Sequence, residues 1–187
     1  VELDKGLTKL AIKPITTSSS AHEVRDLASL LTDDLTTLMD ANPWLLASIS
    51  SQPDKECYVV EGLLRASGTR LRLDVSLLSP NGERLWSDKQ DGHLDNIFDW
   101  QDEVGNHLAT HLLGRIIDAE AARLDSVPDD VKSAEEWFLY GVLQTSADVD
   151  GFLKLISCME RAMALKPDWG RPYLMAVGSL FGASSMG

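Results

Sequence analysis

Apolar and polar residues alternate strictly near the middle of the chain. The apolar positions of this run are Leu71, Leu73, Val75 and Leu77, and the polar positions are Arg70, Arg72, Asp74 and Ser76. A period of two predicts a strand with one buried face and one face in water. Asn81 and Gly82 follow, and this pair favours a hairpin turn because both residues tolerate positive φ. We therefore predict a return strand over 83–90 that ends at Asp91 and Gly92.

Shorter apolar runs before this hairpin predict three more strands. Residues 7–15 form an apolar stretch that ends at Pro14, and a Thr/Ser run over 16–20 then predicts a turn. The runs at 44–49 and 57–66 predict the second and third strands. The hairpin adds the remaining two, so the sequence predicts a sheet of four to five strands.

An amphipathic helix is expected between the first two strands. Ser20 with Glu23 three residues later fits a capping box at its start. The apolar residues that follow recur every three or four positions: Val24, Leu27, Leu31, Leu35 and Leu38. This spacing predicts one buried helical face. Asn42 and Pro43 should end the helix.

A second, long helix is predicted over about 95–124. Its buried stripe would consist of Val104, Leu108, Leu112 and Ile116. Acidic residues fill its first turns, where they suit the positive end of the helix dipole: Asp95, Asp99, Asp102 and Glu103. A polar segment with Pro128 follows at 125–130 and predicts a linker. We therefore expect an α/β domain over 1–127 and a second region over 128–187.

Beyond the linker the pattern predicts helices only. Ser133 and Glu136 fit another capping box, and apolar spacing predicts a helix over about 149–165 before Pro167. The residues that match the tetratricopeptide-repeat motif in order are Trp137, Gly141, Ala162 and Pro167, with Met159 where an aromatic residue is usual. The region resembles one such repeat, which we expect to be cut short, and an ordinary helical hairpin is the alternative. One repeat cannot bury its own apolar face, so we expect it to pack on other parts of the protein.

Together these patterns predict an α+β fold, with a mixed sheet of four to five strands covered by two long helices and followed by tetratricopeptide-like α-helices. The chain has 187 residues, 44% of them hydrophobic and 25% charged, so it can bury a core. Its formal net charge of -12 argues against nucleic-acid binding and against docking on an anionic membrane. No apolar run reaches the 18 or so residues that a membrane span needs.

The two cysteines, Cys57 and Cys158, lie far apart in the sequence and in apolar surroundings. Neither belongs to a paired motif, so a zinc site built on them is not expected. We expect reduced core thiols in a cytoplasmic protein, with a disulfide as the alternative if the chain is exported. The chain begins at Val1 and carries no signal peptide, and we expect it to be a piece of a longer protein.

Three stretches resemble the TolB-amino-terminal-like α/β module. They are the strand at 7–15 with its helix, the hairpin from Tyr58-Val59-Val60-Glu61-Gly62 to Arg84-Leu85-Trp86, and the segment from Gly92 to Glu103. The first strand departs from the module, because it reads Ile12-Lys13-Pro14-Ile15 where Leu-Pro-Phe is usual. The resemblance, with tetratricopeptide repeats behind, implies the C-terminal region of a bacterial class III adenylate cyclase.

This resemblance implies a non-catalytic regulatory or protein-interaction region, with no cofactor, that binds a protein partner or associates with itself. An effector region of a winged-helix transcriptional regulator is one alternative, and a small-molecule sensor is another. The module supplies no catalytic residues, and the sequence shows no constellation of nucleophile and base. We therefore do not expect this chain to be an enzyme, although the parent protein would be one.

Three sets of residues are candidate sites. Glu103, His107 and His111 share one helical stripe, where paired histidines could bind a transition metal, although we favour a solvated polar face. The second set comprises Arg70, Arg72 and Arg84. These arginines could form a patch that binds an anion or a partner, or they could form cross-strand ion pairs with Asp74 and Glu83. The third set comprises Trp169 and Tyr173 as candidates for an interface, with a core or helix-packing position as the alternative for Trp169.

Overall fold

The computed structural model describes residues 7–144 and 148–184. These residues form two compact units. The first, residues 8–116, contains the sheet and is called the sheet unit below. The second begins at Ile117 and contains only helices, and it is called the helical unit.

The sheet is mixed. Its strands are β1 (Thr8–Ile12), β2 (Thr16–Thr17), β3 (Leu45–Ile49), β4 (Tyr58–Ser67), β5 (Arg70–Leu78) and β6 (Arg84–His93). They lie in the order β3-β1-β4-β5-β6, with the short β2 beside β4. β1 runs parallel to β3 and β4, whereas β4, β5 and β6 are antiparallel neighbours. The predicted mixed sheet is confirmed, with β2 as an additional short strand.

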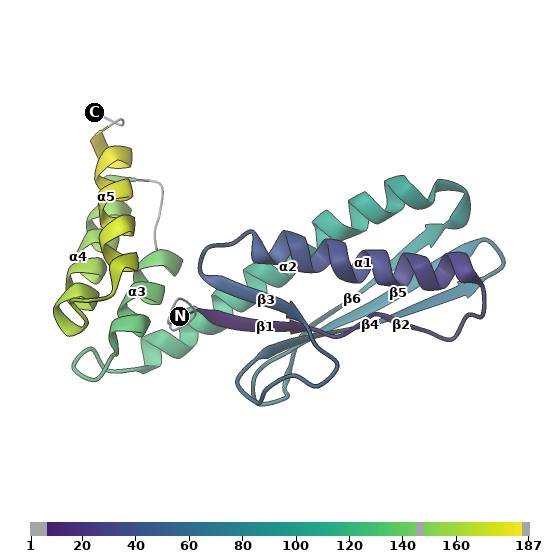
Figure 1. The fold of residues 1–187 in the computed structure, drawn as a ribbon, viewed down its shortest axis with the longest axis horizontal. Helices are drawn as coiled ribbons and strands as arrows, with labels where there is room; N and C mark the ends of the chain where they lie inside the picture. The colour runs from purple at the N-terminus through teal and green to yellow at the C-terminus, as the bar shows by residue number, and fades with distance from the viewer. Residues whose placement is uncertain (1–6, 145–147, 185–187) are drawn as a thin grey trace. The chain divides into compact units, whose positions relative to one another are not determined.

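Two helices lie over the same face of this sheet, as Figure 1 shows. They are α1 (His22–Asp40) and α2 (Ile97–Ser126), which follows a short 3-10 turn, η2 (Leu94–Asn96). Gln101 of α2 donates a hydrogen bond to Asp34 of α1, over 2.5 Å. One turn further on, a Cβ on Gly105 would lie 3.6 Å from Leu38. The two helices therefore run in the same direction, and the predicted pair of covering helices is confirmed.

The alternation in β5 follows from this layering. The alternating side chains of Leu71, Leu73, Val75 and Leu77 are each at most 2% exposed and face the helices, because every second residue of a strand points to the same side. The helices contribute the other half of the core, which includes Val24, Leu27, Leu31, Leu35, Met39, Val104, Leu108, Leu112 and Ile116. Met39 takes the last buried position of α1, where the sequence had suggested Leu38, which is only half-buried.

The entry into α1 differs from the prediction. Thr17 and Ser19 accept hydrogen bonds from backbone N–H groups two residues further on, so the chain turns through 17–21 and the helix begins after Ala21. No side chain caps it, and the predicted capping box at Ser20 is wrong. The first strand also stops early, since Ile15 after Pro14 donates its N–H to Thr32 of α1 instead of to a strand.

The end of β6 also differs. The strand continues through Asp91 and Gly92 to His93, where the sequence had suggested a break. A Cβ on residue 92 would lie 2.4 Å from the Trp100 ring, and the indole N–H of Trp100 donates to the backbone oxygen of Asp91 over 3.0 Å. Glycine is therefore required here by the close approach of α2, and it does not end the strand.

The helical unit contains α3 (Ala134–Leu143), α4 (Val149–Leu165) and α5 (Gly170–Ser184). The capping box of Ser133 and Glu136 at the start of α3 is confirmed. The core of this unit comprises Ala134, Trp137, Phe138, Leu155, Cys158, Met159, Ala162 and Trp169. A Cβ on Gly141 would lie 2.8 Å from the Cβ of Cys158, so this glycine lets α3 and α4 approach closely. A tetratricopeptide repeat remains a prediction.

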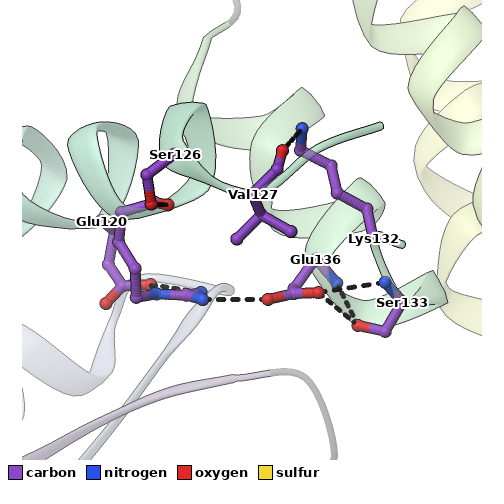
Figure 2. A network of polar contacts seen from close by, with 7 residues as sticks. Glu120, Ser126, Val127, Lys132, Ser133 and Glu136 are labelled. Carbon is purple, nitrogen blue, oxygen red and sulfur yellow. Dashed lines mark hydrogen bonds and ion pairs between the residues drawn. The ribbon is translucent and has the colours of Figure 1, made fainter. Parts of the chain in front are cut away.

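A polar network holds the end of α2 against the start of α3 (Figure 2). Arg123 donates to the buried carboxylate of Glu120 over 3.0 and 3.1 Å and to Glu136 over 3.0 Å. Burial alone would lower the pKa of Arg123, but the two carboxylates raise this pKa by more than burial lowers it. The guanidinium therefore stays charged. Lys132, whose side chain is 4% exposed, donates to the backbone oxygen of Val127 over 2.5 Å.

This network joins two helices within the helical unit. The boundary between the two units falls inside α2, between residues 116 and 117, and α2 runs on to Ser126. The segment that follows contains Pro128, as expected. A domain division at 127/128 remains a prediction.

Candidate interaction surfaces

The face of the sheet that α1 and α2 leave open is positively charged. Its cationic residues are Lys9, Lys13, Arg65, Arg70, Arg72, Arg84 and Lys89, and its acidic residues are Glu61, Asp74 and Asp91. Strand alternation and the cross-strand register place them on this side. Seven positive and three negative groups give this open face a formal charge of +4, although the whole chain carries -12. Because the open face is positive while the whole chain is negative, this face is a candidate surface for a negatively charged partner.

Ion pairs cross the strands of the open face. Arg72 makes a bidentate pair with Asp91 of β6, over 2.6 and 2.9 Å. The hydrogen bond to Asp91 raises the pKa of Arg72, and the same bond lowers the pKa of the Asp91 carboxyl. Arg65 pairs with Asp74, which Lys89 also approaches. Cross-strand pairing is thus present for Arg72, but with Asp91, where the sequence had suggested Asp74 or Glu83.

The structure does not bring the three predicted arginines together. Arg70 lies opposite His93, whereas Arg84 lies opposite Leu78 at the other end of the hairpin. Eight residues of β5 separate these ends, which corresponds to about 27 Å along the strand. The patch proposed from Arg70, Arg72 and Arg84 is therefore divided, and Arg84 stands apart from the other two.

Arg65 takes the place of Arg84 in this group. It lies directly opposite Arg72 across β4 and β5, and Arg70 is two residues from Arg72 on the same side. A hollow of about 410 Å³ is lined by these three arginines together with Ser18, Ser67 and Asp91. The sequence-based prediction missed Arg65, because only the register of β4 against β5 places it there. Its position seven residues before Arg72, across a Ser-Gly turn, was the available signal.

The two histidines of the α2 stripe contact β6, and the stripe also faces water, since Glu103 and His111 are exposed and the His107 side chain is 39% exposed. His107 Nε2 is 2.9 Å from Asp88 Oδ2, and the His111 ring stacks on Trp86 with the ring centres 5.9 Å apart. The two histidine rings are themselves 4.4 Å apart. The stripe is thus polar and exposed to water, as expected, and the edge strand β6 adds partners along one side of its two histidines.

These contacts leave Glu103 exposed and without a place in the cluster. Within the described residues, no group of three or more His, Cys, Asp or Glu side chains could hold a metal ion. Burial raises the pKa of the Asp88 carboxyl, but hydrogen bonds from Gln90, His107 and the Lys89 backbone lower it by more. Asp88 therefore stays ionised and fixes the His107 ring between strand and helix.

The two aromatic residues considered for an interface differ in burial within the helical unit. Trp169 is 8% exposed, and its ring centre lies 5.2 Å from that of Phe138, so it belongs to the core. Of the two positions predicted for Trp169, the structure shows the core position and not the interface. Tyr173 is 44% exposed beside Leu174 and Val177, and it remains a candidate for partner contact.

Both cysteines are free and buried, as expected. Burial is the main cause that raises the pKa of each thiol, for Cys57 and for Cys158. Protonated, buried thiols react slowly with oxidants. The structure therefore assigns them to packing.

Comparisons with known proteins give limited similarity. No family model matches the chain. A stretch of 70 residues is 31% identical to a protein from Rhizobium meliloti (strain 1021) described as "Putative adenylate cyclase 3". That stretch covers 37% of this chain and only 12% of the length of the relative.

Two solved structures are distantly similar. The PelC dodecamer from Paraburkholderia phytofirmans matches with a TM-score of 0.39 and 16% identity, over 59% of this chain and 87% of the PelC chain. TolB from Acinetobacter baumannii matches with a TM-score of 0.39 and 13% identity, over 56% of this chain and 28% of TolB. Among the helices of the described residues, none has the length and apolar character of a membrane span. The weak similarity to the adenylate cyclase relative fits a region of a bacterial signalling protein.

Proposed function

We propose that this chain is a non-catalytic regulatory or protein-interaction region of a larger bacterial signalling protein, a class III adenylate cyclase that makes cyclic AMP. The observation that carries the proposal is the stretch of 31% identity to the adenylate cyclase relative. The chain spans 12% of that relative, so the activity would reside in another part of the parent protein. The region would position the catalytic part, pair two copies of it, or couple a bound partner to it.

The open face supports a role in protein interaction. A sheet with one face uncovered, positively charged and partly apolar can receive a second protein surface. Leu63 at its centre is 39% exposed, between Glu61 and Arg65 on the same strand. The ion pairs already present order the arginines before a partner binds, which lowers the entropy cost of binding.

The test is to read the coding sequence upstream of Val1 and to assay the parent protein with and without residues 1–187. We expect a cyclase domain upstream, and we expect deletion to change the rate of cyclic AMP formation, its regulation or the oligomeric state. Unchanged activity, regulation and oligomeric state after deletion would contradict the proposal. A winged-helix domain upstream would instead assign the chain to a transcriptional regulator.

A second candidate function, small-anion binding, is favoured by the hollow beside Arg65, Arg70 and Arg72. Within the described residues, Arg70 forms no ion pair, so its guanidinium can receive a phosphate or carboxylate. Calorimetric titration with inorganic phosphate, ATP and cyclic AMP tests this function. Binding should weaken in Arg70→Gln and persist in Arg84→Gln, the matched control at the far end of the hairpin. Heat changes absent for all three anions would exclude it.

A further inference from the structure

A second surface of the sheet unit is apolar and lies between the first turns of α1 and α2. A groove of about 360 Å³ opens there, with Leu27 and Leu30 on one wall and Ile97 and Phe98 on the other. Leu27 is buried, but Leu30 is 47% exposed and Phe98 is 78% exposed. Two large apolar side chains thus border a hollow that no other element of the sheet unit fills.

Exposure of Phe98 is not required by the fold. The core stripe of α2 contains Val104, Leu108 and Leu112, and Phe98 lies beside this stripe on the side toward α1. A Phe side chain left in water forgoes roughly 1.5–3 kcal/mol that burial would provide. Exposed apolar side chains that border one hollow together, as Leu30 and Phe98 do, mark a binding surface more often than single scattered ones.

Acidic residues line one wall of this groove. They are Glu23 and Asp26 of α1. The exposed Asp95 of η2 and Asp102 of α2 lie close to Phe98 along the chain. Among the described residues that line the groove, none is lysine or arginine. Arg25, the cation nearest to Glu23 in sequence, lies about 200° around the helix and points away.

We propose that this acid-rimmed groove docks an amphipathic helical segment of a partner protein whose apolar residues are flanked by lysines and arginines. The apolar walls would bury the partner's hydrophobic side chains, and the acidic rim would pair with its cations. Two copies of this chain that met groove to groove would place like charges opposite one another, which costs binding energy. Nucleic acid and anionic membranes carry the sign that the rim repels.

The inference goes beyond the proposed function, because it names a partner chemistry at a different surface. It would hold whichever domain lies upstream of Val1. Failure of the cyclase assay and failure of the groove experiment are therefore separate results. The groove experiment uses the whole chain of 187 residues.

The probe is a synthetic peptide of about four helical turns, with Leu at the positions of one face and Lys elsewhere. A matched peptide carries Glu in place of Lys. Fluorescence anisotropy at neutral pH should show binding of the Lys peptide, weakened by added salt, and no binding of the Glu peptide.

Variants locate the site. Phe98→Ser should weaken binding of the Lys peptide about tenfold or more, which corresponds to the loss of one buried aromatic side chain. The control is Leu174→Ser, which removes an apolar side chain of equal exposure, 77%, from α5. It should leave binding unchanged. Circular dichroism should show both variants folded, since both side chains are largely exposed.

Reversing the charge of the acidic residues tests their contribution to binding separately from that of the apolar walls. Glu23→Lys together with Asp26→Lys should weaken binding of the Lys peptide and let the Glu peptide bind. Equal binding of the Lys peptide to the unmodified chain and to Phe98→Ser would overturn the proposal, as would no binding at all. A dimer in sedimentation that Phe98→Ser dissociates would assign the groove to self-association and would also overturn it.

Discussion

The contacts that stabilise the sheet unit join residues far apart in the sequence, whereas those that stabilise the helical unit join neighbouring helices. In the sheet unit, β1 pairs with strands that lie far along the chain, so Thr8 is opposite Leu45 and Leu10 is opposite Tyr58. In the helical unit, each helix packs on the next one in sequence, and Gly141 meets Cys158. Local contacts can form independently, whereas parallel pairing needs the whole unit. The comparison predicts that mutations will act cooperatively in the first unit and locally in the second.

The two units nevertheless use glycine in the same way. Gly92 admits the Trp100 ring against β6, and Gly141 admits α4 against α3. Neither glycine has positive φ, so the absence of a side chain is what each position requires.

The largest effect is expected in the core of the sheet unit. Leu73 is 0% exposed at the centre of β5. Leu73→Ala should lower the free energy of unfolding by about 2–5 kcal/mol, because it removes buried apolar atoms and leaves a cavity. Urea denaturation followed by tryptophan fluorescence measures this loss. A loss below about 1 kcal/mol would contradict a single close-packed core.

Gly92→Ala should destabilise the corner between β6 and α2. Its Cβ would lie 2.4 Å from a Trp100 ring that is itself 7% exposed, so the strain cannot be relieved into solvent. We expect a loss of about 1–3 kcal/mol in thermal or urea unfolding. The control is Gly114→Ala in α2, where nothing lies within 4 Å of the added Cβ. That substitution should stabilise by about 0.5–1 kcal/mol, and equal effects of the two would contradict the close approach.

Gly141→Ala should act in the helical unit. The added Cβ would meet Cys158 and Met159 at 2.8 and 2.9 Å, but alanine also favours the helix by about 1 kcal/mol. The net loss should therefore be about 1 kcal/mol, smaller than for Gly92→Ala. Hydrogen exchange should show lost protection in α3 and α4 while β4 and β5 keep theirs. Equal loss in both units would show that the chain unfolds as one body.

The smallest effect concerns pH. The folded pKa of Asp88 lies below its usual value, so its ionised form contributes stability that is present above about pH 4. That stability is lost as the pH falls through the folded pKa. The difference in unfolding free energy between the unmodified chain and Asp88→Asn should accordingly shrink below about pH 4. A difference independent of pH between 2 and 6, measured by urea titration at about one-unit intervals, would show a non-ionic role.

Much of this architecture could be predicted from local patterns. Alternation in β5, the Asn81-Gly82 turn, the buried stripe of α2 and the capping box at Ser133 each depend on neighbours within a few residues. Such signals keep their meaning in any surrounding fold. They were therefore enough for the strands, the helices and the mixed sheet.

The candidate surfaces depended on register and on distance in space. Arg65 lies beside Arg70 and Arg72 only because β4 pairs with β5 in one particular register. The register of β5 against β6 places Arg84 at the opposite end of the hairpin. His107 has Asp88 as its partner because α2 lies against β6, and Trp169 is buried because the turn between α4 and α5 brings its ring to Phe138 of α3. No window of neighbouring residues contains these relations.

The sequence by itself determined which residues could form strands and helices, which face of each would be apolar, and that the chain carries a large negative charge. Only the tertiary structure decided where that charge is reversed, on the open face of the sheet, and where Phe98 and Leu30 remain exposed between two helices. The physical reason is that secondary structure follows from periodicity along the chain. A binding surface is made by side chains from separate elements, and their proximity is set by packing.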